Sequence, residues 1–233
     1  MASTFPEKNI YCSYFPDSQV DFNAHPEFSE LVPRFINGNV NNNSGDIPRL
    51  WSFMLNCKQV LNESIPGDFA ELGVYKGNTA AILAYYASRA SRLVFLFDTF
   101  EGFRQADIKG VDAGQRLDGF KDTSIDFVKS VIGEDSLACR FVPGHFPGTF
   151  DEQHRSRNYA LVNLDCDLYE PMKAGLEIFY PLLSRGGILF LHDYSSMHWA
   201  GAKLAVDEFC RNTGEYVILM PDKSGSAFLR KSR

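Results

Sequence analysis

Short apolar runs alternate with segments of helical spacing along most of this chain, and this alternation constrains the fold more than any other feature. The apolar runs that read as strands are residues 67–73, 92–98, 138–144, 159–165 and 186–193. Helical patterns precede, separate and follow them, at residues 48–64, 78–90, 124–132, 171–183 and 199–212. Strands that are apolar throughout and are separated by helices form parallel sheets covered on both faces.

The chain closes with two more extended runs, 215–220 and 225–230, which are separated by four residues. Four residues are too few for a helical crossover, so the last strand is expected to be antiparallel. The prediction is a doubly wound, Rossmann-like α/β fold with a seven-stranded, mostly parallel sheet over residues 48–233. Residues 1–47 lack the alternation. They are expected to form an irregular amino-terminal extension, in which the Asn-rich run 37–46 is a flexible loop.

Composition and charge narrow the classes of partner. The formal net charge of −6 disfavours nucleic acid, because neutralising phosphates needs clustered lysine and arginine. No apolar run approaches the roughly 20 residues that span a bilayer, so no membrane partner is expected. The amino terminus lacks the basic and apolar regions of a signal peptide. The five cysteines form no CxxC pair, which reduced thiols in a cytoplasmic protein explain most simply.

The loop after the first predicted strand carries the spacing E-x-G-x-x-x-G, formed by Glu71, Gly73 and Gly77. Ligands of open α/β sheets bind at the carboxyl ends of strands, and the two glycines allow a ligand to approach the backbone. This spacing is not the dinucleotide fingerprint, and the Glu71 carboxylate would repel a pyrophosphate. A positively charged or zwitterionic ligand suits the loop better. The alternative is two glycines in a tight strand-to-helix turn.

The second predicted strand ends at Asp98, where doubly wound folds place an acid that binds the hydroxyls of a ribose. Taken alone, Asp98 suits a loop cap as well. Together with Glu71 and the two glycines, it favours a nucleoside ligand without a phosphate chain, such as S-adenosylmethionine. After the third strand, Gly144 permits close approach, and Phe146 is placed to flank an adenine ring. His145 is interpreted as part of a turn.

Acidic residues follow the fourth and fifth predicted strands, whose ends are neighbours over one cleft in a doubly wound sheet. Asp165 and Asp167 follow the fourth strand, and His192 and Asp193 follow the fifth. Asp165, His192 and Asp193 are therefore expected to converge on one cation. Two carboxylates suit Mg²⁺, whereas the imidazole favours Mn²⁺, Fe²⁺ or Zn²⁺. The alternative is that Asp165 and Asp167 cap the following helix.

Four segments of the chain resemble the macrocin O-methyltransferase (TylF-like) family of class I S-adenosylmethionine-dependent methyltransferases. They are IPGDFAELGVYKGNTA, LFDTFEGF, LDCDLYEPMKAGLEIFYPLLSRGGILFLHDYSS and VDEF, in the family's order and spacing. The resemblance runs from about Pro48 to the carboxyl terminus and implies that residues 48–233 form a methyltransferase domain. It also implies methyl transfer to a hydroxyl of an antibiotic sugar or a related natural product.

The resemblance assigns roles to residues of this chain. The expected cofactor site comprises Glu71, Gly73, Tyr75, Gly77, Asn78, Thr79, Asp98, Thr99, Phe100, Gly144, Phe146 and Asp165. Family members bind Mg²⁺ through the positions of Asp165, His192 and Asp193. The position of Asp167 is that of a candidate general base. His192 departs from the family pattern, which has aspartate there.

Several mechanisms stay open at this point. Asp167 and His192 are the candidate bases for the hydroxyl proton. With a metal ion, Asp165 and Asp193 would anchor it and His192 would complete the ligand set. Without one, His192 is the natural base, because its ordinary pKa lies near neutral pH. Alternatively, His192 only donates a hydrogen bond to a loop carbonyl.

The chain is alternatively a catalytically inactive nucleoside-binding module, whereas Glu71 disfavours a nicotinamide dehydrogenase. Residues 1–47 and 99–120 are expected to form the lid and to bind a small-molecule acceptor, although their aromatic residues equally suit a homodimer interface.

Overall fold

A single seven-stranded sheet organises the computed structural model, which describes residues 25–232. The strand order is β3-β2-β1-β4-β5-β7-β6, with β1 to β5 paired in parallel and β7 antiparallel to both of its neighbours. The strands are β1 (Asp68–Leu72), β2 (Val94–Asp98), β3 (Cys139–Pro143), β4 (Tyr159–Leu164), β5 (Leu183–Leu191), β6 (Ile218–Leu219) and β7 (Ala227–Arg230). The predicted doubly wound fold and its antiparallel last strand are confirmed.

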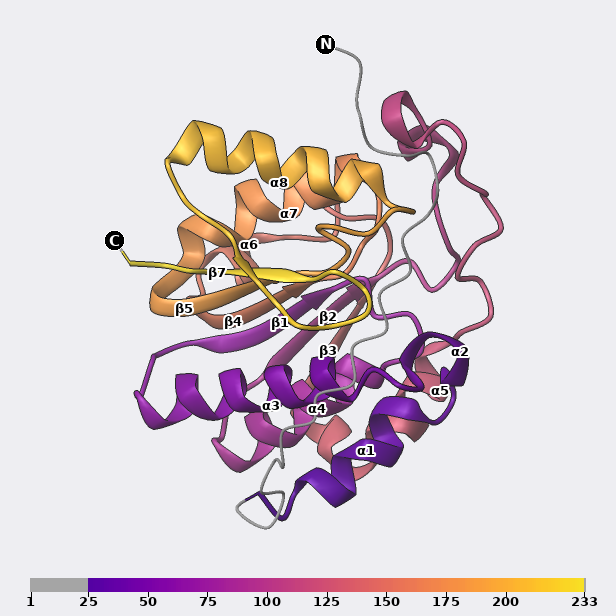
Figure 1. Cartoon of the computed structure of the whole chain (residues 1–233). Helices are drawn as coiled ribbons and strands as arrows, with labels where there is room; N and C mark the ends of the chain where they lie inside the picture. Colours follow the sequence, from indigo (N-terminus) through magenta and orange to yellow (C-terminus); the bar gives the residue numbers. More distant parts are fainter. Residues whose placement is uncertain (1–24, 233) are drawn as a thin grey trace.

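Helices cover both faces of the sheet (Figure 1). The lower layer in that view contains α1 (Phe28–Ile36), α3 (Ile47–Asn62), α4 (Asn78–Arg89) and α5 (Ile125–Ile132). The upper layer contains α6 (Glu152–Arg155), α7 (Tyr169–Leu182) and α8 (Ala200–Thr213). Every residue of β4 is buried, as expected for a central strand that packs against a helix layer on each face. No helix in the described part of the chain is long and apolar enough to cross a membrane.

Several helix ends follow from local sequence. Pro48 lies in the first turn of α3, where the missing N–H costs nothing. The side chain of Ser124 accepts a hydrogen bond from the Phe127 amide and caps α5. Helix α8 ends at Thr213 and is capped by Gly214, which takes the left-handed conformation that glycine adopts without strain. These signals explain why the predicted helices lie close to their observed bounds.

The amino-terminal part differs from the sequence-based expectation. Where an irregular extension was expected, the structure has α1 and the short α2 (Val40–Asn43), so that prediction is wrong for these residues. Leu31 and Phe35, four residues apart, are fully buried in the core that α1 shares with α4. The Asn43 side chain is buried and donates to the Phe35 carbonyl at 2.7 Å, so the Asn-rich run is not a free loop. Residues 1–24, with most of the aromatics assigned to a lid or dimer interface, lie outside the described residues.

Two further bounds differ from the expectation. The extended run at 215–220 forms a strand only over Ile218–Leu219. Strand β5 begins at Leu183, three residues before the predicted start at 186, and ends before His192 rather than including it. The long 99–120 segment contains two single-turn 3₁₀ helices, η2 (Gln105–Asp107) and η3 (Gly110–Asp112).

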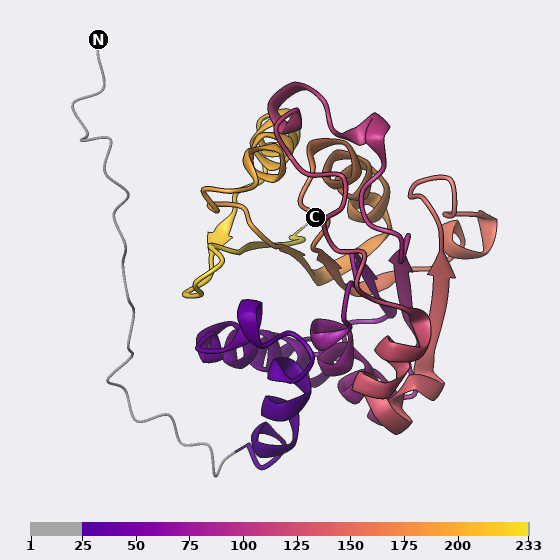
Figure 2. The same ribbon diagram turned by 90° about the vertical axis from the view of Figure 1, so that its right-hand side faces the viewer.

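The carboxyl ends of the parallel strands lie at one edge of the sheet. Strand order reverses between β1 and β4, which is the topological switch point where such sheets bind ligands. Figure 2 views the molecule from this side, and the 99–120 segment runs across the upper part of the view. The fold thus brings the strand-end residues of the sequence prediction to a common edge.

Candidate active site

A cavity of about 680 Å³ opens at the carboxyl ends of the parallel strands. Most of the predicted site residues line it: Gly73, Tyr75, Asn78, Thr79, Asp98, Thr99, Gly144, Phe146, Asp165, Asp167, His192 and Asp193. Three predicted cofactor residues lie outside its lining, namely Glu71, Gly77 and Phe100. A cavity of this size matches the range in which proteins enclose small molecules.

Gly73 and Gly77, the two glycines of the first loop, exclude a side chain for different reasons. A Cβ at Gly73 would lie 1.9 Å from the carbonyl oxygen of Asp165, so glycine is needed where β1 and β4 end side by side. A Cβ at Gly77 would lie 2.6 Å from the Val128 side chain, so this glycine accommodates α5. Both residues have positive φ angles, +86° and +79°. The tight-turn interpretation therefore accounts for Gly77, while Gly73 also borders the cavity.

Glu71 lies beneath the cavity, fully buried. Its Oε1 accepts hydrogen bonds from Thr79 Oγ1 at 2.5 Å and from Asn163 Nδ2 at 2.7 Å. Burial raises the pKa of this carboxyl to about 8, against the lowering effect of these two donors. Glu71 thus joins β1 to the first turn of α4 and to β4, and its buried Oε2 has no hydrogen-bond partner.

Asp98, at the end of β2, holds the neighbouring loop in place. Its Oδ2 accepts the backbone N–H groups of Val74 at 2.7 Å and Tyr75 at 2.8 Å. Its Oδ1 accepts the N–H of Phe100 at 2.7 Å. This carboxylate therefore fixes the β1–α4 loop while remaining at the cavity wall. Phe100 itself turns into the apolar core.

Unusual backbone conformations cluster around the cavity. Tyr75, Phe100, Asp167 and Asp193 follow four different strands, and all four have positive φ angles, between 47° and 61°. Residues other than glycine rarely adopt this region, and they persist there only when the surrounding structure imposes it. Such residues concentrate at binding and catalytic sites, so their position supports a functional role for this edge of the sheet.

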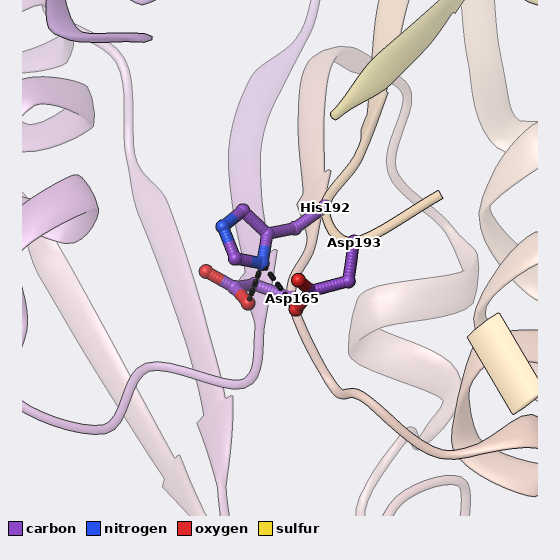
Figure 3. A group of neighbouring side chains, drawn as sticks. All are labelled: Asp165, His192 and Asp193. Atoms are coloured by element: carbon purple, nitrogen blue, oxygen red, sulfur yellow. Dashed lines mark hydrogen bonds and ion pairs between the residues drawn. The ribbon is translucent and has the colours of Figure 1, made fainter. Parts of the chain in front are cut away.

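The predicted convergence of Asp165, His192 and Asp193 is present. The Nδ1 atom of His192 lies 2.7 Å from Asp165 Oδ1 and 2.7 Å from Asp193 Oδ2. Figure 3 shows the imidazole facing both carboxylates, with its second nitrogen turned away from them. Burial disfavours the imidazolium, but the charges of Asp165 and Asp193 raise the pKa of His192 well above its ordinary value.

The pKa values of two carboxyl groups in this cluster shift in opposite directions. Burial opposes ionisation of Asp165, yet the neighbouring His192 holds its pKa below the ordinary value. Burial, followed by the negative charges of Asp193 and Asp165, raises the pKa of Asp167 well above its usual range. Opposite shifts between neighbouring titratable groups are typical of acid–base sites.

A residue that the sequence prediction missed, Arg49 on α3, reaches the same cluster. Its Nη1 contacts Nε2 of His192, and only 6% of Arg49 is exposed. Its Nη2 donates to Asn43 Oδ1 at 2.5 Å, and its Nε lies 3.5 Å from Asp46 Oδ2. The guanidinium carbon lies 5.0 Å from the Phe35 ring centroid.

The contact with Arg49 bears on the state of the imidazole. An arginine N–H only donates, so Nε2 accepts a hydrogen bond from Arg49 only when the ring is neutral and carries its proton on Nδ1. The guanidinium also opposes the imidazolium that the two carboxylates favour. A sequence signal for Arg49 exists, because it shares the buried stripe of Phe53 and Cys57 at four-residue spacing. A charge on such a stripe needs a buried partner.

Aromatic side chains form a further wall of the cavity. Phe103 and Phe120 belong to the 99–120 segment, and Trp199 precedes α8. The ring centroids lie 5.3 Å apart for Phe103 and Phe120, and 5.7 Å apart for Phe103 and Trp199. The Asn-rich run also contributes to the lining. The two segments assigned to acceptor binding thus both reach the cavity.

A side-chain contact between Asp107 and His145 joins the 99–120 segment to the end of β3, and Arg104 pairs with Asp107 within the segment. Nε2 of His145 lies 2.7 Å from Asp107 Oδ2, and Arg104 Nη2 lies 3.1 Å from Asp107 Oδ1. His145, interpreted from the sequence as part of a turn, thus also joins the end of β3 to this segment.

Known proteins resemble this chain in sequence and in fold. A tetracenomycin-type 4'-O-methyltransferase of Streptomyces olivaceus, named for a 2,3-dimethoxy-rhamnosyl substrate, is 32% identical over 64% of this chain and 61% of its own length. The demethyldecarbamoylnovobiocin O-methyltransferase of Streptomyces niveus is 30% identical over 70% of this chain and 65% of its own length. The solved O-methyltransferase NovP covers 80% of this chain and 81% of its own, with a TM-score of 0.68 at 24% identity.

The matched region spans about three fifths of the curated relatives' length, and the likeness to NovP shows the fold. The sequence model of the macrocin-O-methyltransferase (TylF) family matches residues 46–225, which is most of the chain. The matched range contains the strand-end cluster, which consists of Asp165, Asp167, His192 and Asp193, and the cofactor loop at residues 71–77. The chain therefore belongs to the macrocin-O-methyltransferase (TylF) family.

Proposed function

We propose that this protein is an S-adenosylmethionine-dependent O-methyltransferase that acts on a hydroxyl of a small molecule, a sugar or a sugar-bearing natural product. One observation carries the proposal. A single cavity joins Gly73 and Asp98, at the predicted cofactor end, to Asp165, Asp167 and His192 at the ends of the neighbouring strands. Family membership and the names of the relatives support the same reaction class.

The residues of the cofactor end fit a sulfonium nucleoside. Carboxylates of Asp98, Asp165 and Asp193 line the cavity, and they favour a cationic ligand over a pyrophosphate. Asp98 is placed for the ribose hydroxyls, and Gly73 lines the cavity at the end of β1. S-adenosylmethionine, when bound, supplies a methyl group whose carbon–sulfur bond breaks as the acceptor oxygen bonds to the methyl carbon.

Asp167 is favoured over His192 as the proton acceptor. Both ring nitrogens of His192 are engaged, Nδ1 by Asp165 and Asp193 and Nε2 by Arg49. Burial and the neighbouring acids raise the pKa of Asp167, which makes it a stronger base than an ordinary carboxylate. In the proposed reaction the acceptor hydroxyl gives its proton to Asp167, and alignment of the two reactants supplies much of the rate.

The residues do not fit the Mg²⁺ ion that the family resemblance implies. The ligand atoms of Asp165, His192 and Asp193 do lie within 4.8 Å of one another. Magnesium prefers oxygen ligands, however, and His192 offers a nitrogen. The imidazole would suit a softer cation, but the positive guanidinium of Arg49 lies against the same ring and opposes any divalent ion there. The proposed reaction therefore runs without a metal ion.

The acceptor end of the cavity suits a sugar. Aromatic rings such as Trp199 and Phe120 offer flat apolar surfaces for the C–H face of a sugar ring. The amide side chains of Asn39, Asn41 and Asn42 also line the cavity and offer hydrogen bonds to hydroxyl groups. This pairing of an apolar wall with amides favours a polyhydroxylated acceptor.

A turnover assay tests the proposal. The full chain would be incubated with S-adenosylmethionine and a panel of deoxysugar glycosides, and the release of S-adenosylhomocysteine would be followed together with the methylated product. We expect product with at least one glycoside and loss of about 100-fold or more in kcat for Asp167→Asn. Binding of S-adenosylmethionine without turnover on any acceptor would favour the inactive nucleoside-binding alternative.

A further inference from the structure

A fixed positive charge of the protein, the guanidinium of Arg49, lies next to the three residues that the family resemblance assigns to a divalent cation. The guanidinium of Arg49 contacts the face of the cluster that Asp165 and Asp193 leave open, through Nε2 of His192. Arginine stays charged at all working pH values, so this charge does not depend on conditions.

The rest of the structure holds this charge in place. Asn43 accepts from Nη2 and Asp46 lies beside Nε, so α2 and the start of α3 fix the direction of the guanidinium. Asp46 is itself fully buried and accepts the backbone N–H of Lys223 at 3.2 Å. The Arg49 side chain therefore has one orientation, in which its head group faces His192.

A divalent ion and Arg49 would each compensate the negative charges of Asp165 and Asp193, and the two cations would repel each other. An ion bound to Asp165 and Asp193 would take the place that the Nδ1 side of His192 now occupies. It would then lie on the opposite side of one imidazole ring from the guanidinium, and like charges at that range repel. In this chain His192 stands where the family resemblance implies an acidic ligand, and the guanidinium of Arg49 lies on the far side of its ring.

We infer that Arg49 neutralises the carboxylates of the strand-end cluster through His192, in place of a divalent metal ion. Arg49 is thus a positioning residue: it orients the His192 ring, and the ring holds Asp165 and Asp193 together. Only the catalytic consequence of this charge rests on the proposed function. The contacts among Arg49, His192, Asp165 and Asp193 do not depend on a bound methyl acceptor.

Manganese binding tests the inference directly. The full chain, freed of metal by a chelator, would be titrated with Mn²⁺, and the free ion would be followed by electron paramagnetic resonance. The test variant is His192→Asp combined with Arg49→Met, which restores an all-oxygen set and removes the cation. The matched control is His192→Asp combined with Arg104→Met, which removes a cavity-lining arginine that pairs with Asp107 instead.

We expect the Arg49→Met double variant to bind one Mn²⁺ about tenfold or more tightly than both the wild type and the control. A smaller gain would overturn the inference. So would one Mn²⁺ bound by the wild type with a dissociation constant below about 1 mM and lost in Asp165→Asn, a result that needs no double variant to fold. Neither titration uses a methyl donor or acceptor, so failure of the proposed function would leave its outcome unchanged.

Discussion

Arg49 and His192 are 143 residues apart in the chain, and their side chains meet at the carboxyl edge of the sheet, Nη1 against Nε2. One residue comes from α3 and the other follows β5, so the contact joins the lower helix layer to the strand-end cluster. The helices before β1 therefore contribute to the site as well as covering the sheet. The stability of that contact is open to measurement.

Arg49→Met is expected to lower the free energy of unfolding by about 3 kcal/mol, because it leaves buried acceptors and carboxylates without their cation. Arg104→Met is the control, since 53% of the Arg104 side chain is exposed and its ion pair is correspondingly weak. Urea denaturation of both variants provides the measurement. An equal loss of unfolding free energy in the two variants would show that the buried Arg49 contacts stabilise the protein no more than the exposed Arg104 ion pair does.

Gly73→Ala is expected to destabilise the protein by about 3 kcal/mol or more for two reasons. The new Cβ would clash with the backbone of Asp165, and alanine would be strained at the positive φ of this position. Gly214→Ala isolates the second effect, because that glycine has a φ of +75° and no atom lies within 4 Å of the place that the new methyl group would take. Its expected cost is about 1 kcal/mol. Thermal unfolding of the pair compares them, and a similar loss in both would rule out the backbone clash as the cause.

Glu71 is expected to make stability depend on pH. Burial raises the pKa of its carboxyl from 4.5 to about 8, so the folded protein binds this proton more tightly than the unfolded chain. The resulting stabilisation is complete below pH 4.5 and is lost as the pH rises through about 8. Between about pH 5 and pH 8, the Tm of the wild type should therefore fall by more than the Tm of Glu71→Gln. Parallel Tm profiles would contradict the raised pKa.

Asp98→Asn is expected to weaken S-adenosylmethionine binding by about tenfold or more, because an amide cannot accept from the loop amides and the ribose as a carboxylate does. Glu101→Gln is the matched control, since Glu101 is exposed and absent from the cavity lining. Equilibrium dialysis with labelled S-adenosylmethionine measures both. If the two variants bind alike, Asp98 is only a loop cap.

The sheet and the strand-end residues were predictable because they depend on local pattern. Apolar runs such as those of β2 and β4 mark central strands, and parallel strands bring their carboxyl ends to one edge. The meeting of Asp165 with His192 and Asp193 follows from that rule alone. Chain order and the separation of the last two runs were enough for the antiparallel β7.

The missed features depend on contacts between distant segments. Helix α2 has no apolar pattern, and its Asn43 is buried only because the Phe35 carbonyl and the Arg49 guanidinium satisfy the side-chain amide. The buried stripe of α3 marks Arg49 as unusual, but its partner His192 is 143 residues away in the chain and cannot be named from that pattern. A loop-cap role for Asp98 was an alternative in the sequence analysis, but the Val74 and Tyr75 amides that it accepts could not be named from the sequence.

The central claim is that the cavity binds S-adenosylmethionine, and isothermal titration calorimetry tests it most directly. We predict one bound molecule per chain with a dissociation constant on the order of 10 µM, and no heat with NAD under the same conditions. Absence of binding heat with S-adenosylmethionine at about 1 mM would contradict it.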